Sequence, residues 1–215
     1  HLLVPGPWEG RIIEVSPGQH HHIEKVLRRE PGSGVSYTDG AGRRGEGTWT
    51  IAGVERGDEV SVPEPSASLT LAVAPPDSKE RIRWLVEKCT ELGVARIRWI
   101  RTRNGHGRPP RPDKAHAWMQ SALEQSRRSR VTLVDSGWTP LDELGDYVAA
   151  DQAGTTFRPT GSMTLAIGPE GGWAPSELPS TTELVSLGPG VLRIETAAVS
   201  AAAQFGALTD ASTNQ

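Results

Sequence analysis

The chain has 215 residues, which is enough for one large domain or two small ones. No apolar run approaches the roughly 18 residues of a membrane span, and no basic-then-apolar leader precedes the fold, so we expect a cytoplasmic protein without membrane contact. Its single cysteine, Cys89, excludes an internal disulfide, and the net charge of −3 by itself argues against binding nucleic acid.

The first part of the chain alternates short strand-like runs with glycine turns. One helix, Gln19–Glu30, interrupts these runs, because its apolar residues recur at helical spacing. The predicted strands are Arg11–Val15, Val35–Thr38, Trp49–Val54 and Glu59–Val62. A linker rich in Pro and Ser at residues 63–68 then marks a domain boundary, so residues 1–66 are predicted to form a small β-rich domain.

Two patterns in this region resemble ligand sites but are better explained otherwise. The run His20–His22 suggests a metal, yet adjacent helical residues diverge by about 100° and no Cys or carboxylate motif supports them, so we predict no metal site. The spacing Gly-x-Gly-x-x-Gly from Gly40 matches a dinucleotide-binding motif, but Thr48–Ile51 reads as a strand where that motif requires a helix. These glycines are more typical of a hairpin opened by Asp39 and Gly40.

Beyond the linker, short apolar strands alternate with helical segments, which is typical of a parallel α/β sheet. The strands are predicted at Leu69–Ala74, Ile97–Ile100, Val131–Val134, Tyr147–Ala150, Thr164–Ile167 and Leu184–Leu187. The helices are predicted from a capping box of Asp77 and Glu80 to Leu92, from about residue 113 to residue 127, and over Ile194–Leu208. Cys89 falls on the apolar face of the first helix and is predicted to be a core residue.

Two of the predicted strands run directly into glycine loops, at Gly168–Gly172 and at Gly188–Gly190. Glycine lets a backbone approach a ligand closely, and parallel sheets bind ligands at the carboxyl ends of their strands. No Gly-Lys-Ser/Thr signature accompanies the loops, which argues against a nucleotide phosphate. On loop composition alone, tight turns of an α/β fold are the favoured interpretation.

Charge is distributed unevenly along the chain. Residues 96–130 carry ten Lys or Arg residues against Asp113 and Glu124, whereas residues 131–215 carry two basic and ten acidic residues. A segregated basic stripe is the electrostatic footprint expected of a surface that binds a phosphate backbone, although a solvated charged face is the alternative.

Several short segments match one protein family in the order in which they occur. GPEGG at residues 168–172 is followed by LG-x-x-VLR-x-ETA at residues 187–197, and an ELGV segment at residues 91–94 precedes them. Together with the short segments HHI and VLR near residues 21–28, these motifs resemble the SPOUT methyltransferases over nearly the whole chain. More narrowly, they resemble the ribosomal RNA small subunit methyltransferase E family.

The resemblance implies a fold and a cofactor. The two glycine loops would tie a deep trefoil knot that holds S-adenosylmethionine, and residues 1–66 would form a PUA-like β-barrel that helps to bind RNA. The expected fold class is therefore α/β, with a SPOUT-type knotted parallel domain over residues 69–215. The implied cofactor-binding residues are Leu165, Ile167, Gly168, Pro169, Glu170, Gly171, Gly172, Leu187, Gly188, Val191, Leu192, Thr196 and Ala197.

The resemblance also implies a reaction, methyl transfer to N3 of a uridine in the 16S ribosomal RNA of the small (30S) subunit. N3 is a weakly acidic imide, so an arginine that favours its anion would assist, with Arg103 as the first candidate and Arg193 as the second. Glu170 is interpreted as a loop-ordering residue bonded to backbone amides, with a general base as the alternative. RNA contacts are assigned to His22, Arg28, Arg101, Arg127, Arg128 and Arg130.

The chain departs from the family pattern in the basic loop. Arg103 is followed by Asn104 where the family has serine, and Lys114 and Ala115 stand in place of an Arg-Trp pair. Family members are homodimers, and the alanine-rich segment Thr196–Ala203 would suit such an interface. Two other interpretations stay open: a SPOUT methyltransferase for another RNA, such as ribose 2′-O methylation of transfer RNA, and a non-catalytic RNA-binding ribosome-assembly factor.

Overall fold

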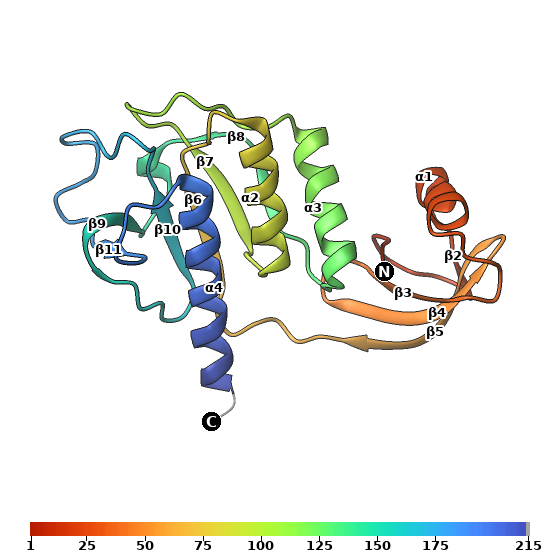
Figure 1. Ribbon diagram of the computed structural model, residues 1–215. Helices are drawn as coiled ribbons and strands as arrows, with labels where there is room; N and C mark the ends of the chain where they lie inside the picture. The colour runs from red at the N-terminus through yellow and green to blue at the C-terminus, as the bar shows by residue number, and fades with distance from the viewer. Residues whose placement is uncertain (214–215) are drawn as a thin grey trace. The chain divides into compact units, whose positions relative to one another are not determined.

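The computed structural model describes residues 1–213, which divide into two compact units (Figure 1). The first unit contains residues 1–64 and 123–131, and the second contains residues 65–122 and the chain from Thr132 onward. The break after Glu64 lies in the segment rich in Pro and Ser. Nothing in the sequence indicated that residues 123–131 would group with the first unit.

The first unit is built on a five-stranded sheet in the order β1-β3-β4-β5-β2. Its strands are β1 (Leu2–Leu3), β2 (Ile12–Ile13), β3 (Gly34–Thr38), β4 (Arg43–Thr50) and β5 (Gly53–Ser61). β1 pairs with β3 in parallel and the other pairs are antiparallel, so the predicted hairpin after Asp39 is confirmed as the β3–β4 connection. β1 and β2 are edge strands that do not pair with each other among the described residues.

Two sequence predictions in this unit are wrong. Trp49–Val54 is not one strand, because the chain reverses at Ile51 and Ala52, and Gly53, which begins β5, has a φ of +133°. The predicted helix Gln19–Glu30 is shorter and consists of α1 (Pro17–His21) and the π-helical turn η1 (His22–Val26). Arg28 follows with a φ of +51°, a left-handed conformation that no helix can continue through.

A cluster of charged side chains surrounds Glu59 near the end of β5. Glu59, whose side chain is 11% exposed, accepts hydrogen bonds from Arg56 Nε at 2.7 Å and from the Tyr37 hydroxyl at 3.0 Å, and it also pairs with Arg43. The hydrogen bonds from Arg56 outweigh the cost of burial and lower the pKa of Glu59 from 4.5 to about 2. The carboxylate therefore stays ionised and joins β3, β4 and β5.

The second unit contains a six-stranded sheet in the order β11-β9-β10-β6-β7-β8, and every pair in it is parallel. Its strands are β6 (Leu69–Val73), β7 (Arg96–Ile100), β8 (Leu133–Thr139), β9 (Val148–Thr156), β10 (Met163–Ile167) and β11 (Leu184–Ser186). The parallel α/β sheet is thus confirmed. The chain moves outward from β6 to β8 and resumes on the other side of β6, so the strand order reverses between β6 and β10.

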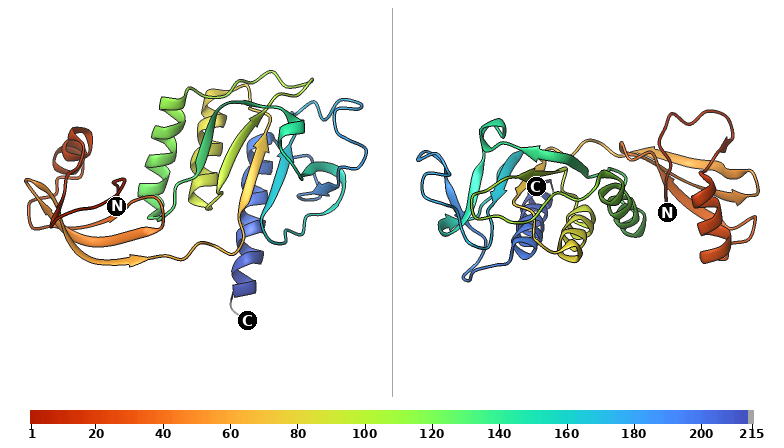
Figure 2. Two further views of the ribbon diagram at one scale, coloured as in Figure 1. Left: turned by 180° about the vertical axis from the view of Figure 1, so that it is seen from behind. Right: turned by 90° about the horizontal axis from the view of Figure 1, so that it is seen from above.

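Helices α2 (Lys79–Glu91), α3 (Pro112–Ser126) and α4 (Ile194–Thr213) lie on one face of this sheet, with α2 beside α4 (Figures 1 and 2). The opposite face is covered by the short 3₁₀ helix η2 (Leu141–Glu143) and by residues such as Trp173. Ser78 caps α2 by accepting from the Arg81 amide, so the predicted cap at Asp77 is wrong by one residue.

The alanines of α4 are used inside the chain. Ala198 and Ala201 are completely buried, and Ala197 and Ala202 are nearly so. Small side chains let α4 approach α2 and the sheet closely. Thr196 and Ala203 lie on the other face of the helix and are exposed, so a contribution of Thr196–Ala203 to a dimer interface stays a prediction.

We expect the first unit to lose stability at acidic pH through Glu59. Because folding lowers the pKa of this carboxyl, its contribution is complete above pH 4.5 and is lost as the pH falls toward 2. The loss should amount to roughly 1–3 kcal/mol, measured by urea denaturation between pH 5 and pH 2.5. Glu59→Gln should remove most of this pH dependence. Glu46→Gln, on the exposed side of β4, should keep it, and an equal effect of both variants would contradict the assignment.

Candidate functional site

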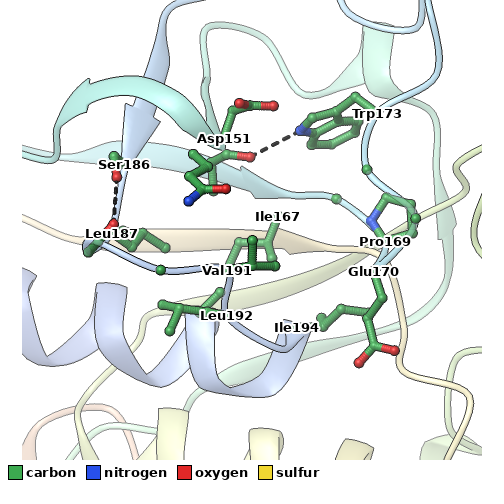
Figure 3. Close-up of a pocket in the computed structure, with 18 residues that line it drawn as sticks. Asp151, Ile167, Pro169, Glu170, Trp173, Ser186, Leu187, Val191, Leu192 and Ile194 are labelled. Carbon is green, nitrogen blue, oxygen red and sulfur yellow. Dashed lines mark hydrogen bonds between the residues drawn. The ribbon is translucent and has the colours of Figure 1, made fainter.

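A cavity of about 410 Å³ opens where β10 and β11 end, beside the middle of β9 (Figure 3). Two loops supply most of its wall, residues 168–173 after β10 and residues 187–193 after β11. The lining residues are Ala150, Asp151, Gln152, Ile167, Gly168, Pro169, Glu170, Gly171, Gly172, Trp173, Ser186, Leu187, Gly188, Gly190, Val191, Leu192, Ile194 and Ala197. The cavity thus lies at the edge where parallel sheets bind ligands.

The first loop is folded tightly against the indole of Trp173. Trp173 Nε1 donates to the Ala150 carbonyl at 3.1 Å, and a Cβ at Gly168 would approach the indole ring to 2.8 Å. The Gly172 amide donates to the Pro169 carbonyl at 2.9 Å, and Gly172 has a φ of +73°. Glycine is therefore required at positions 168 and 172 by the protein's own packing and backbone conformation.

The glycines of the second loop are not required by the packing of the protein itself, and they leave open space at the cavity. A Cβ at Gly188 or Gly190 would meet no atom within 4 Å, and neither residue has a positive φ. The main-chain amides of these two glycines donate to no acceptor in the described part of the chain. The loop is held from behind, because Ser186 Oγ donates to the Gly188 carbonyl at 2.9 Å and Gln204 of α4 donates to the Leu187 carbonyl at 3.1 Å. Its backbone is thus fixed and open toward the cavity.

Arg81, in the first turn of α2, connects both loops. Its guanidinium donates to Glu195 at 2.9 and 2.7 Å and also pairs with Glu170. Glu195 is 10% exposed and lies in the first turn of α4, where the helix favours a negative charge. Burial opposes ionisation of Glu195, but the bonds from Arg81 prevail, so its pKa lies below the usual range. The bonds to Glu195 and Glu170 likewise raise the pKa of Arg81.

Glu170 therefore orders its loop through Arg81 and not through backbone amides, which corrects the sequence interpretation. The ion pair with Arg81 gives Glu170 a structural role, and its alternative role as a general base stays a prediction. In Figure 3 its carboxylate points away from the Trp173 end of the loop.

Most of the predicted cofactor residues line this one cavity. Those that do are Ile167, Gly168, Pro169, Glu170, Gly171, Gly172, Leu187, Gly188, Val191, Leu192 and Ala197. Two do not: Leu165 is completely buried within β10, and Thr196 is on the exposed side of α4. Both lie a few residues outside the loops and do not line the cavity.

β9 and Trp173 also line the cavity, although neither was among the predicted site residues. Ala150, Asp151 and Gln152 line the cavity although no motif marks them. A usable signal was present, because Asp151 directly follows the predicted strand Tyr147–Ala150, at the carboxyl end where ligands bind. Trp173 directly follows the GPEGG segment, and its indole ring packs against Gly168 of the loop.

The basic loop after β7 is tied to the first glycine loop. The Arg103 amide donates to Glu177 Oε1 at 2.6 Å, and Asn104 Nδ2 donates to the Gly172 carbonyl at 3.0 Å. The Arg103 side chain is exposed and has no ion-pair partner in the described part of the chain. Arg193, the second candidate, is exposed just before α4 and does not line the cavity.

The residues assigned to RNA contacts have different surroundings. His22, Arg28 and Arg127 are exposed, and Arg101 is exposed beside Trp138. Arg128 is partly buried, and its carbonyl is 3.2 Å from His1 Nε2. Arg130 has a structural role instead, since its guanidinium donates to the carbonyls of Ala41 and Val62 at 2.7 and 2.8 Å.

Within residues 1–213, no group of three or more His, Cys, Asp or Glu side chains is arranged to hold a metal ion. His20 packs edge-on against Trp49 with a ring-centroid distance of 4.8 Å, and its Nε2 lies 3.1 Å from the Ile51 carbonyl. No helix in the described chain is long and apolar enough to cross a membrane.

Comparisons with known proteins give a consistent family. A family model described as RNA methyltransferase domain matches residues 63–206. The ribosomal RNA small subunit methyltransferase E of Mycobacterium tuberculosis is 34% identical, with 94% of this chain and 89% of that protein covered. Its namesake from Rickettsia conorii is 26% identical, with 91% and 90% covered. The crystal structure of that enzyme from Neisseria gonorrhoeae, bound to S-adenosyl methionine, superposes with a TM-score of 0.84 at 25% identity over 96% of each chain.

Removing Arg81 should loosen both loops of the cavity. Arg81→Met leaves Glu195 buried without its cation, so the free energy of unfolding should fall by roughly 2–4 kcal/mol. Amides of residues 168–172 and 187–193 should exchange hydrogen faster, as measured by mass spectrometry. Arg83→Met is the matched control, because Arg83 forms an exposed pair with Glu87 on the same helix and should change stability by less than about 1 kcal/mol. Unchanged exchange in both loops would contradict the role given to Arg81.

Proposed function

The chain belongs to the ribosomal RNA small subunit methyltransferase E family, and from this premise we propose that it methylates N3 of a uridine in small-subunit ribosomal RNA. Its cofactor is S-adenosylmethionine, in keeping with the ligand of the Neisseria gonorrhoeae structure. The observation that carries the proposal is the cavity between the two glycine loops, whose wall includes the GPEGG and LG-x-x-VLR segments. It combines apolar side chains with unpaired main-chain amides at the ligand-binding edge of the sheet.

The residues present fit such a cofactor. Ile167, Leu192 and Ile194 offer apolar contacts for a flat adenine ring, while the open amides of Gly188 and Gly190 can donate to its polar atoms. No side chain fills the space over these glycines, so the cavity accepts a ligand without rearrangement of its backbone. When bound, the cofactor supplies an electrophilic methyl group on a sulfonium.

The chain's own residues must make N3 of uracil nucleophilic. The N3 proton would pass to solvent, and N3 would then accept the methyl group as the carbon–sulfur bond of the cofactor breaks, which leaves S-adenosylhomocysteine. A guanidinium close to the base stabilises the negative charge that develops on the uracil, and each lowered pKa unit is worth about 1.4 kcal/mol. We assign this role to Arg103, because its main chain is anchored to Glu177 beside the first glycine loop and its side chain is unpaired in the described residues. Arg193 is the second candidate.

Further features belong to the same proposal. We infer that the two cavity loops form a trefoil knot, that residues 1–66 act as a PUA-like RNA-binding domain, and that the protein works in the cytoplasm as a homodimer on the 30S subunit. Exposed cations support RNA binding, among them Arg101 and Arg127. Arg130 is left out of this set, because its guanidinium is bonded to carbonyls within the first unit.

A valine at position 188 should block the cofactor without disturbing the fold. Gly188→Val places methyl groups in open space at the cavity wall, so affinity for S-adenosylhomocysteine should fall by at least about tenfold in titration calorimetry. Its stability should stay within about 0.5 kcal/mol of the wild type. Gly34→Val on β3, also open and without a positive φ, is the matched control and should bind normally. Wild-type affinity in Gly188→Val would place the cofactor elsewhere.

The product of the wild-type enzyme tests the proposed reaction directly. Assembled small subunits from cells that lack the protein should gain 3-methyluridine when incubated with enzyme and S-adenosylmethionine, as measured by mass spectrometry of digested nucleosides. Appearance of another methylated nucleoside would indicate a different RNA target atom. Cofactor binding without methylation of any RNA would favour the non-catalytic assembly factor.

Arg103 should separate catalysis from binding. Arg103→Ala should lower the single-turnover methylation rate by at least about tenfold, or some 1.4 kcal/mol, because charge on the base develops mainly in the transition state. Affinity for RNA should fall little, with the salt slope reduced by about one phosphate contact at most. A wild-type rate combined with much weaker RNA binding would make Arg103 an anchor, and Arg193 would be tested next.

A further inference from the structure

An exposed tryptophan lies at the open edge of the second unit's sheet. β8 is an edge strand that extends to Thr139, farther than the predicted Val131–Val134 (Figure 1). Trp138 near its end is 36% exposed, whereas Trp99, its register partner on β7, is completely buried. Trp138 therefore leaves part of its ring open to solvent at this edge of the sheet.

Arg101 lies over this ring. Its guanidinium carbon is 5.0 Å from the centroid of the Trp138 ring, and Arg101 directly follows β7. Arg101 is exposed and forms no ion pair with another described residue. The guanidinium lies over one face of the indole, which holds it in place, and an exposed guanidinium supported in this way can stack on a nucleobase.

A groove of about 470 Å³ runs along the same strand. It is lined by Arg96, Leu133, Val134, Asp135, Ser136, Gly137, Trp138 and Thr139. Asp135 pairs with Arg96 at 2.9 Å and with Arg98 at 3.6 Å, so the floor carries little unpaired charge. Arg101 does not line the groove but lies over the ring of Trp138, which does, and it forms no ion pair with another described residue.

We propose that Trp138 and Arg101 form a stacking platform for an unpaired base of the RNA substrate, next to the nucleotide that is methylated. The inference rests on the proposed function, which makes RNA the substrate, and it adds a residue that no motif identified. Arg101 is two residues before Arg103, so the platform and the proposed catalytic arginine belong to the same short segment of the chain. Stacking on an aromatic side chain tolerates different bases and requires an unpaired strand, which suits a target inside a ribosomal RNA loop.

The experiment separates base stacking from phosphate binding with two probes of equal length, an oligouridine and its abasic counterpart. Trp138→Leu should weaken binding of the oligouridine by about 5- to 100-fold and leave binding of the abasic strand unchanged. Trp138→Phe should restore most of the affinity. Arg101→Lys, which keeps the charge and loses the flat guanidinium, should also weaken only the oligouridine complex. Trp84→Leu, at an exposed tryptophan of α2, is the control and should bind both probes normally.

Equal weakening for both probes, wild-type affinity in Trp138→Leu, or an equal effect of Trp84→Leu would each overturn the platform. Failure of wild-type protein to prefer oligouridine over the abasic strand would also overturn it. Thermal denaturation of Trp138→Leu reports on folding, and Arg101→Lys supplies the answer if that variant unfolds. On assembled subunits, Trp138→Leu should raise KM and leave kcat nearly unchanged. Absence of methylation by the wild type would refute the proposed function alone, because the two binding probes do not depend on it.

Discussion

The cavity depends on one arginine that holds its two walls in place. The glycine loops follow different strands, and little of their own structure would keep them at a fixed separation. Arg81 joins them from a third element, α2, by bonding Glu170 in the first loop and Glu195 at the start of α4. Because Glu195 is nearly buried, its charge is tolerable only with this partner. The second loop leads directly into α4, so fixing that helix also fixes the loop. Ligand binding is thus coupled to the packing of α2 against α4.

The same wall is extended by contacts from the basic loop after β7. The Asn104 side chain reaches the loop directly and donates a hydrogen bond to the carbonyl of Gly172. The Glu177 carboxylate accepts hydrogen bonds from the main-chain amides of Arg103 and Ala174. The basic loop is in this way anchored to the segment that lines the cavity. Changes in one loop, such as departure of a ligand, will therefore affect the position of the other.

Local patterns were enough to predict the parallel sheet, because its strands are short apolar runs separated by helical segments. The glycine loops were located by their motif, and their position at the carboxyl edge follows from the sheet itself. Arg81 could not be assigned, since its partners lie 89 and 114 residues away and no local pattern connects them. Grouping of residues 123–131 with the first unit was likewise hidden, because it depends on distant backbone bonds such as Gly42 to Ser129. The predicted strand Trp49–Val54 was wrong because the pattern of apolar residues does not reveal that the chain reverses at Ile51 and Ala52.

The glycines of the two loops are held to different structural requirements. Gly168 is required by the indole of Trp173 and Gly172 by its φ, so both serve the folded chain whether or not a ligand binds. Gly188 and Gly190 have ordinary backbone angles and empty space around them, so the protein alone does not require them. A lineage that lost its ligand would be free to accumulate larger residues at positions 188 and 190 while it retained the other two. Inspection of these four positions would then separate working enzymes from descendants that keep only the scaffold.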